Sequence, residues 1–182
     1  MKKILLLLLL PILSFGQTIN SFPWVHDFEN IVGLEQDTTN DRDWWLMQGP
    51  TGSQLTGPQG DHTTGSGIYY YAEASTSGIG HPSQTFITYT PTFDVSQTPG
   101  KVLSFWYHMY GSTMGDLEAG YIDSSGYTIL GIISGNQGDQ WKFAYYPIAA
   151  TDSFKIVFTA TTGSSFYSDI CIDDIMVSDP FT

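Results

Sequence analysis

The sequence predicts an all-β domain, a jelly-roll β-sandwich built from two antiparallel sheets. Short runs rich in β-branched and aromatic residues recur along the chain, separated by stretches of Gly, Pro, Asn, Asp and Ser. The spacing of apolar residues that marks a helix is absent throughout. About ten such runs within one chain are too many for a single small sheet and favour two sheets packed face to face.

The amino terminus is expected to be a secretory signal peptide that covers residues 1–16. A basic start, Met1–Lys3, leads into an apolar run, Ile4–Leu13, and a small-residue end, Ser14–Gly16. The run is too short to span a membrane, and no cysteine follows it that could carry a bacterial lipid anchor. The mature chain would therefore begin at Gln17 and be secreted or held at the cell surface, without a transmembrane span.

The remaining chain is expected to form one domain from about residue 22 to 178. In chain order its strands should cover Trp24–Glu29, Asp43–Gln48, Ser66–Glu73, Gln84–Tyr89, Lys101–Tyr110, Asp116–Asp123, Tyr127–Ile133, Gln140–Pro147, Phe154–Ala160 and Ile170–Val177. Asp123–Gly126 is typical of a hairpin turn, and Gly135–Asp139 of a longer loop. The first and last strands should be adjacent, so that Phe28 and Ile175 share one sheet.

The strand at 101–110 is expected to lie at the centre of a sheet because both of its faces are bulky. One face carries Leu103, Phe105, Tyr107 and Met109, and the other carries Ser104, Trp106, His108 and Tyr110. Core packing would bury both Phe105 and Trp106. The alternative is an exposed aromatic platform for a sugar, formed by Trp106, His108 and Tyr110.

The mature chain is strongly acidic. Without Lys2 and Lys3, four basic residues stand against 18 acidic ones, which gives a formal net charge of −14. This balance argues against nucleic acid or an anionic membrane as the partner, and it fits cations, neutral sugars or other proteins. The single cysteine, Cys171, has no partner for an internal disulfide, and its apolar strand predicts a buried position.

A glycine-rich loop at 56–67 leads directly into the strand that begins near Ile68. The glycines permit tight turns that other residues would forbid. The one carboxylate of the loop, Asp61, lies among Gly and Thr, whose carbonyls and hydroxyls are the hard oxygen ligands that calcium takes. A calcium site is one interpretation of this pattern, and a solvated Asp in a turn is the other.

Four segments together resemble the MAM domain, named for meprin, A5 antigen and receptor phosphatase mu. They are His26–Glu29; Gln36–Trp44, which leads on to Gly57–Gly67; Leu103–Gly111; and the pair Ile133–Trp141 and Asp169–Ile175. These segments follow one another in the family's order and spacing over about residues 22 to 178. The resemblance implies a jelly roll that mediates self-association or docking in extracellular proteins.

The chain departs from the family pattern at its cysteines. Where the animal family has them, this chain has His26, the Gly33–Glu35 region and Val102, so the resemblance implies a disulfide-free relative of bacterial type. The family scaffold also implies a structural calcium ion that ties the first strand to the last. The residues that fall where its ligands are expected are Glu29, Asp61, Asp173 and Asp174. The alternative for the last two is one hydrogen-bonded and one solvated carboxylate.

No catalytic signature is present, so the chain is not expected to be an enzyme. The resemblance implies a non-catalytic interaction or adhesion module that binds an extracellular protein or glycan, with self-association as one form of contact. A carbohydrate-binding module is the first alternative, with Trp44, Trp45 and Tyr110 as ligand-facing aromatics. An accessory domain of a secreted peptidase or other hydrolase is the second. Clustered exposed aromatics would favour sugar binding, and a flat apolar patch would favour protein contact.

Overall fold

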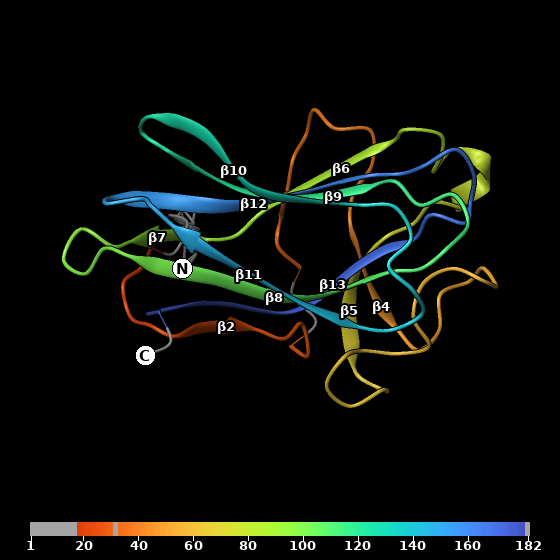
Figure 1. The fold of residues 1–182 in the computed structure, drawn as a ribbon, viewed down its shortest axis with the longest axis horizontal. Helices are drawn as coiled ribbons and strands as arrows, with labels where there is room; N and C mark the ends of the chain where they lie inside the picture. The colour runs from red at the N-terminus through yellow and green to blue at the C-terminus, as the bar shows by residue number, and fades with distance from the viewer. Residues whose placement is uncertain (1–17, 31–32, 181–182) are drawn as a thin grey trace, which may run out of the picture.

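Two β-sheets pack face to face in the computed structural model, which describes residues 18–30 and 33–180 (Figure 1). The expected signal peptide lies outside the described residues. Apart from the strands, the described residues contain one short 3-10 helix, η1 (Thr76–Gly78). None of their helices has the length and apolar character needed to cross a lipid bilayer.

The first sheet has seven strands arranged around a central one. They are β1 (Thr18–Ile19), β3 (Glu35–Gln36), β6 (Thr85–Tyr89), β7 (Thr92–Asp94), β9 (Asp116–Asp123), β10 (Gly126–Ser134) and β12 (Ser153–Thr161). The central strand, β12, pairs with β9 on one side and with β6 and β7 on the other. The hairpin partner of β9 is β10, which forms an outer edge of this sheet.

The second sheet has six strands. They are β2 (Trp24–His26), β4 (Trp45–Gln48), β5 (Ile68–Ala72), β8 (Lys101–Met109), β11 (Lys142–Ile148) and β13 (Ile170–Ser178). Strand β13 lies between β8 on one side and β2 and β5 on the other. Strand β2 is thereby joined to β13, the last strand of the chain, with His26 opposite Ile175. Phe28, which is expected to share this sheet with Ile175, lies two residues beyond the end of β2.

All of the expected strands are present, with ends shifted by a few residues. The structure adds β1, β3 and β7, which have two or three residues each and are too short for a period of two to show. The predicted sandwich of antiparallel sheets is confirmed, and the short pairing of β1 with β7 is the parallel ladder among the described strands. Each strand contributes two residues to this ladder, and the two strands are far apart in the sequence, so no hairpin turn forces them to run antiparallel.

The core between the sheets is aromatic and closely packed. Phe105 on β8 is fully buried, and its ring meets Phe158 on β12 edge to face, with ring centroids 4.9 Å apart. Phe28 stacks on Tyr70 at 4.9 Å. Strand β8 is therefore a central strand, as its two bulky faces predict.

The outer face of the second sheet is covered by the long loop between β4 and β5. The loop is fixed by hydrogen bonds from Tyr69 Oη to Gly49 O (2.8 Å) and from Trp141 Nε1 to Gly60 O (3.0 Å). Beneath it Cys171 is fully buried. Trp106 is half-buried under a stacked His62 ring, 3.7 Å away, so an exposed sugar platform on β8 does not exist.

Candidate functional site

The glycine-rich loop is built around Asp61, whose side chain is almost completely buried. Its carboxylate accepts hydrogen bonds from Thr64 N (2.8 Å), Thr64 Oγ1 (2.9 Å) and Gly67 N (2.5 Å). Partial burial acts to raise the pKa of Asp61, but the hydrogen bonds from Thr64 and Gly67 lower it below its usual value. Asp61 is therefore a charged residue that organises the loop, and not a solvated turn residue.

Glu29 meets Asp61 across Gly67. Glu29 Oε1 accepts a hydrogen bond from Ile68 N at 2.7 Å. A Cβ atom on Gly67 would lie 2.1 Å from Glu29 Oε1 and 3.0 Å from Asp61 Cγ, so a larger residue here would displace the Glu29 carboxylate. Two acidic side chains from distant parts of the chain are thus brought to one place, as the resemblance implies.

The two adjacent Asp residues of β13 have different surroundings. Asp173 is buried, and its Oδ2 accepts a hydrogen bond from His62 N at 2.9 Å. Burial, together with the charges of Asp174 and Asp61, raises the pKa of Asp173 to about 7. Asp174 is turned to His62 Nδ1 (2.7 Å) and Thr63 Oγ1 (2.6 Å) instead.

All four predicted calcium ligands therefore contact the glycine-rich loop. Glu29 and Asp61 lie over Gly67, and Asp173 and Asp174 accept hydrogen bonds from His62. The oxygen chemistry of this set suits calcium. Within the described residues, however, no group of three or more His, Cys, Asp or Glu side chains has the spacing that holds a metal ion. Of these carboxylates, Glu29 and Asp61 both lie against Gly67.

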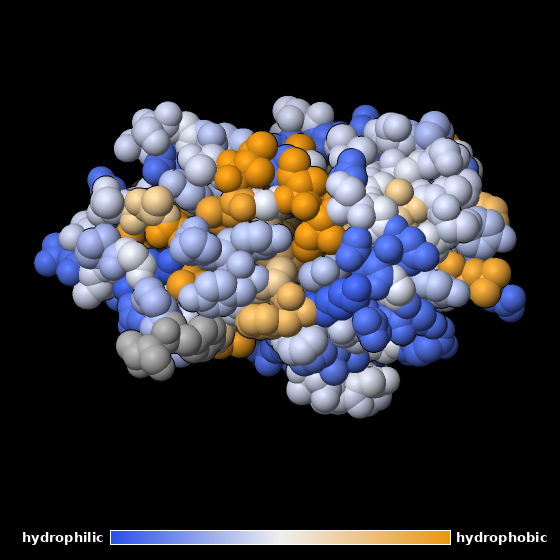
Figure 2. Space-filling view, in the orientation of Figure 1, coloured by the Kyte–Doolittle hydropathy of each residue, from blue (hydrophilic) through white to orange (hydrophobic). Residues whose placement is uncertain are grey.

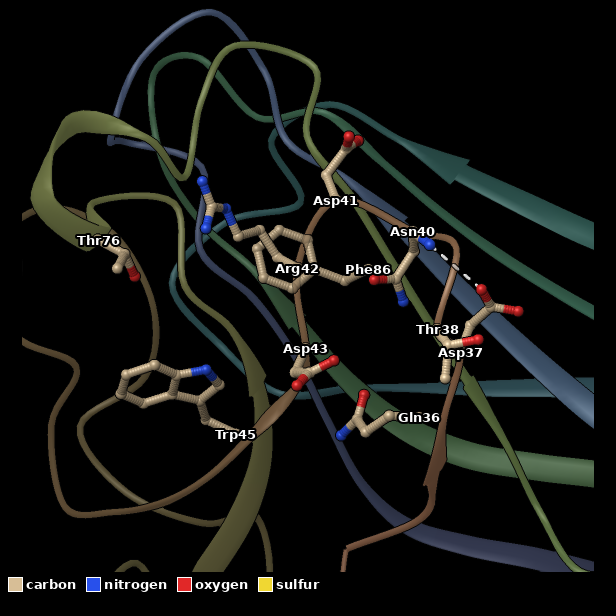
Figure 3. A pocket seen from close by; sticks show the side chains of 10 residues that line it. All are labelled: Gln36, Asp37, Thr38, Asn40, Asp41, Arg42, Asp43, Trp45, Thr76 and Phe86. Carbon is tan, nitrogen blue, oxygen red and sulfur yellow. Dashed lines mark hydrogen bonds between the residues drawn. The ribbon is translucent and has the colours of Figure 1, made fainter.

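The predicted ligand-facing aromatics have three different environments. Trp45 is 53% exposed and lines a cavity of ≈ 500 Å³ together with Asp43, Arg42 and Thr76 (Figure 3). Trp44 is only 3% exposed and stacks on Tyr70, so the expectation that it faces a ligand is wrong. Tyr110 is half-buried and lines a separate cavity of ≈ 400 Å³.

Strands β9 and β10 carry an exposed apolar surface that the sequence patterns do not predict. Four large side chains form it, Ile122 (42% exposed), Tyr127 (45%), Ile129 (52%) and Ile132 (54%), and we call them the β9–β10 face. Figure 2 shows hydrophobic side chains gathered over the middle of the molecule, where β10 lies. Beside them is a groove of ≈ 270 Å³ lined by Ile87, Tyr89, Ile122, Tyr127, Val157 and Thr159. The signal that could have found this face is the absence of any charged residue in β10.

Cys171 and His108 form the buried pair that most resembles a catalytic Cys–His pair, but their surroundings do not activate the thiol. Cys171 lies opposite His108 on the neighbouring strand, and both are shielded from solvent by the β4–β5 loop. Burial raises the pKa of the Cys171 thiol and lowers the pKa of His108, so a thiolate–imidazolium pair is disfavoured. His108 Nε2 instead meets Asp139 Oδ1 at 3.2 Å.

A second buried acid lies in the same layer. Asp169 on the segment before β13 is fully buried, and its Oδ1 accepts a hydrogen bond from Ala74 N at 3.0 Å. Its Oδ2 has no hydrogen-bond partner among the described residues. Burial raises the pKa of Asp169 to about 7. This carboxyl links β13 to the end of β5 and lies away from every surface cavity described above.

The sequence is similar to a protein family and to several known proteins. The sequence model of the MAM domain, meprin/A5/mu, matches residues 26–180. Thyroid hormone-induced protein B of Xenopus laevis is 36% identical over 153 residues, which is 81% of this chain and 21% of the relative. Human MAM domain-containing protein 2 is 37% identical over 144 residues, 77% of this chain and 20% of the relative. The chain thus spans about a fifth of the length of these relatives.

Solved structures share the fold at low sequence identity. A cleaved adhesin domain of Lys-gingipain from Porphyromonas gingivalis aligns with a TM-score of 0.55 and 16% identity, over 88% of this chain and 100% of that domain. A carbohydrate-binding module solved with β-1,4-galactotriose aligns with a TM-score of 0.51 and 13% identity, over 85% of this chain and 94% of the module. At these identities the likeness concerns the fold alone.

Proposed function

Because the chain belongs to the MAM domain family, we propose that it is a non-catalytic interaction module that acts outside the cell. The contact that we propose is self-association, in which the β9–β10 face of one copy meets the same face of a second copy. The observation that carries the proposal is the nature of β10. It is a nine-residue edge strand without a charged side chain, and three of its large apolar side chains are exposed.

An edge strand of this kind is a template for pairing. Among the described residues β10 forms a ladder with β9 alone, which leaves one side of its backbone without a strand partner. Soluble proteins usually block such an edge with lysine, proline or another charge. The one device present here is a bulge at Leu130, which interrupts the ladder between Ile129 and Gly131. Two antiparallel copies of β10 would place Ile129 and Ile132 beside their counterparts across a two-fold axis.

The charge of the chain supports the same partner. The mature chain has a formal net charge of −14, so two copies repel one another over most of their surfaces. Strand β10 has no charged side chain, and Glu118 on the neighbouring strand β9 accepts a hydrogen bond from Tyr127, so two such molecules can approach here at a low electrostatic cost. Because salt screens the remaining repulsion, association through this face should strengthen as ionic strength rises. An interface held by ion pairs would weaken instead.

Sedimentation equilibrium of the mature domain tests the proposal. We expect a monomer–dimer equilibrium that shifts toward dimer with added salt. Ile132→Lys should weaken dimerisation at least about tenfold, because it places a charge on the exposed edge. Ile79→Lys introduces the same change at a residue that is 47% exposed and directly follows η1, outside the β9–β10 face, and it should leave the equilibrium unchanged.

The proposal fails if the wild-type domain stays monomeric at high protein concentration and high salt. It also fails if Ile132→Lys and Ile79→Lys have equal effects, since the dimer would then be formed elsewhere. A dimer that dissociates on addition of salt would indicate an ionic interface and exclude the β9–β10 face.

We also propose that a structural calcium ion stabilises the fold at Glu29 and Asp61, with Asp173 beside them. The set lies where β2, β13 and the glycine-rich loop meet, so an ion there would neutralise acids from distant parts of the chain. Loop carbonyls could supply further oxygens, since calcium takes six to eight in all. Binding to the folded state alone would add about 2.7 kcal/mol of stability when calcium is about a hundredfold above its Kd.

Thermal melting in millimolar calcium and in excess chelator checks the calcium proposal. The melting temperature should be higher with calcium, and Glu29→Gln should abolish the difference. Glu35→Gln is the matched control. Glu35 is exposed and pairs with Lys155, and both residues lie on the first sheet. Identical melting temperatures with calcium and with chelator in the wild-type domain would exclude the site.

A further inference from the structure

We propose that the cavity beside Trp45, here called the Trp45 pocket, binds a neutral sugar. The pocket lies where the segment from Gln36 to Trp45 crosses the edge of the sandwich and faces η1 and β6 (Figure 3). Its volume of ≈ 500 Å³ falls within the range of about 300–1,000 Å³ that is typical of small-molecule sites. It is separate from the β9–β10 face and from the predicted calcium ligands, so its ligand is independent of both proposals above.

The wall of the pocket is braced before any ligand arrives. Asp37 accepts hydrogen bonds from Thr39 N (2.6 Å), Thr39 Oγ1 (2.6 Å) and Tyr89 Oη (2.6 Å). Asp41 Oδ2 accepts hydrogen bonds from Thr85 N (2.9 Å) and Thr85 Oγ1 (2.7 Å). The loop is thereby fastened to β6, and each of these two carboxylates already accepts hydrogen bonds from neighbouring residues. A ligand would meet a preformed surface, which lowers the entropic cost of binding.

The groups left for a ligand are Trp45, Asp43, Arg42 and Thr76. Figure 3 shows the Asp43 carboxylate between Trp45 and Gln36, and the Arg42 guanidinium on the side of Thr76. Within the described residues, the side chains of Asp43, Trp45 and Thr76 make no hydrogen bond, and Arg42 Nε is buried without a partner. The pocket therefore offers an acceptor-only carboxylate, a donor-only guanidinium and a hydroxyl, all beside an exposed indole face.

This combination matches a polyhydroxylated ring without charge. The C–H face of a sugar can lie against the indole of Trp45, while its hydroxyls donate to Asp43 and accept from Arg42. Anionic ligands are disfavoured because three carboxylates, Asp37, Asp41 and Asp43, surround a single arginine. The Arg42 guanidinium opposes a cationic ligand in turn, and Asp43 makes no hydrogen bond within the described residues.

The test is a glycan array that contains neutral, acidic and amino sugars, followed by calorimetric titration of each hit. We expect binding of neutral glycans, and we expect Trp45→Ala and Asp43→Asn each to weaken it at least about tenfold. Both side chains are exposed, so neither change should unfold the domain, and circular dichroism checks this. Phe143→Ala removes an aromatic of similar exposure (48%) on β11, at a distance in the fold, and should leave affinity unchanged.

Three results would overturn the proposal: no glycan that depends on Trp45, a preference for amino or acidic sugars, or equal losses in Trp45→Ala and Phe143→Ala. Ile132→Lys, the variant that blocks the β9–β10 face, should bind the same glycans as the wild type. Failure of self-association and failure of sugar binding are therefore distinguishable in one set of proteins.

Discussion

Replacing Phe105 by alanine is expected to lower the free energy of unfolding by about 3–5 kcal/mol. Phe105 is fully buried on the central strand β8, where its ring contacts Phe158 from the opposite sheet and Tyr146 from β11. Deleting the ring removes apolar contacts from both sheets and leaves a cavity that the rigid strands cannot close. Urea denaturation, followed by tryptophan fluorescence, measures the loss.

Phe143→Ala is the matched control for this change. Phe143 lies on the neighbouring strand β11, directly opposite Trp106, but it is 48% exposed. Its removal should cost less than about 1 kcal/mol. A similarly small cost for Phe105→Ala would show that β8 does not lie at the centre of the core. The packing of the two sheets around Phe105 would then be wrong.

Replacing Asp169 by asparagine is expected to change how stability depends on pH. Burial raises the pKa of Asp169 to about 7 in the folded state, whereas an unfolded Asp titrates near about 3.9. Between these values the folded state binds the proton more tightly, so wild-type stability should fall as pH rises from about 4 to about 7 and stay level above. Three pKa units correspond to about 4 kcal/mol as an upper bound.

The asparagine variant keeps an acceptor for Ala74 N and removes the buried charge. It should equal the wild type near pH 4 and exceed it by up to about 4 kcal/mol at pH 8. The measurement is urea denaturation of both proteins at several pH values, and their difference cancels the contribution of every other acid. Asp152→Asn, an exposed carboxylate in the turn before β12, is the control and should leave the curve unchanged. A variant that is less stable than the wild type at pH 8 would contradict the assignment.

Long strands such as β9 and β12 could be predicted because their apolar residues alternate, and β8 because both of its faces are bulky. The face of a strand on which a given residue lies is harder to predict than the presence of the strand. Trp44 and Trp45 are adjacent and similar, yet one is buried and the other is exposed, because successive side chains point to opposite faces. The same ambiguity applies to Asp173 and Asp174, of which the first is buried against His62 N and the second meets His62 Nδ1 and Thr63 Oγ1.

The binding surfaces depend on topology that no local pattern reports. The exposure of Ile129 and Ile132 follows from the uncovered outer face of the first sheet at β9 and β10, where Ile122 on the inner strand β9 is exposed as well. The Trp45 pocket is closed by Thr76 and Phe86, which lie some distance along the chain from Asp43. The pairing of Glu29 with Asp61 could be anticipated from the family resemblance, but the role of Gly67 between them could not.

Amide hydrogen exchange along β10 tests the central claim of self-association most directly. Exchange of the mature domain is compared, by mass spectrometry, between dilute and concentrated solutions at the same pH and salt. If β10 pairs with a second copy, peptides that contain Tyr127–Ile133 should gain protection with concentration, while those from the opposite edge of the fold do not. Exchange in β10 that is independent of concentration, alongside a dimer detected by sedimentation, would contradict the account.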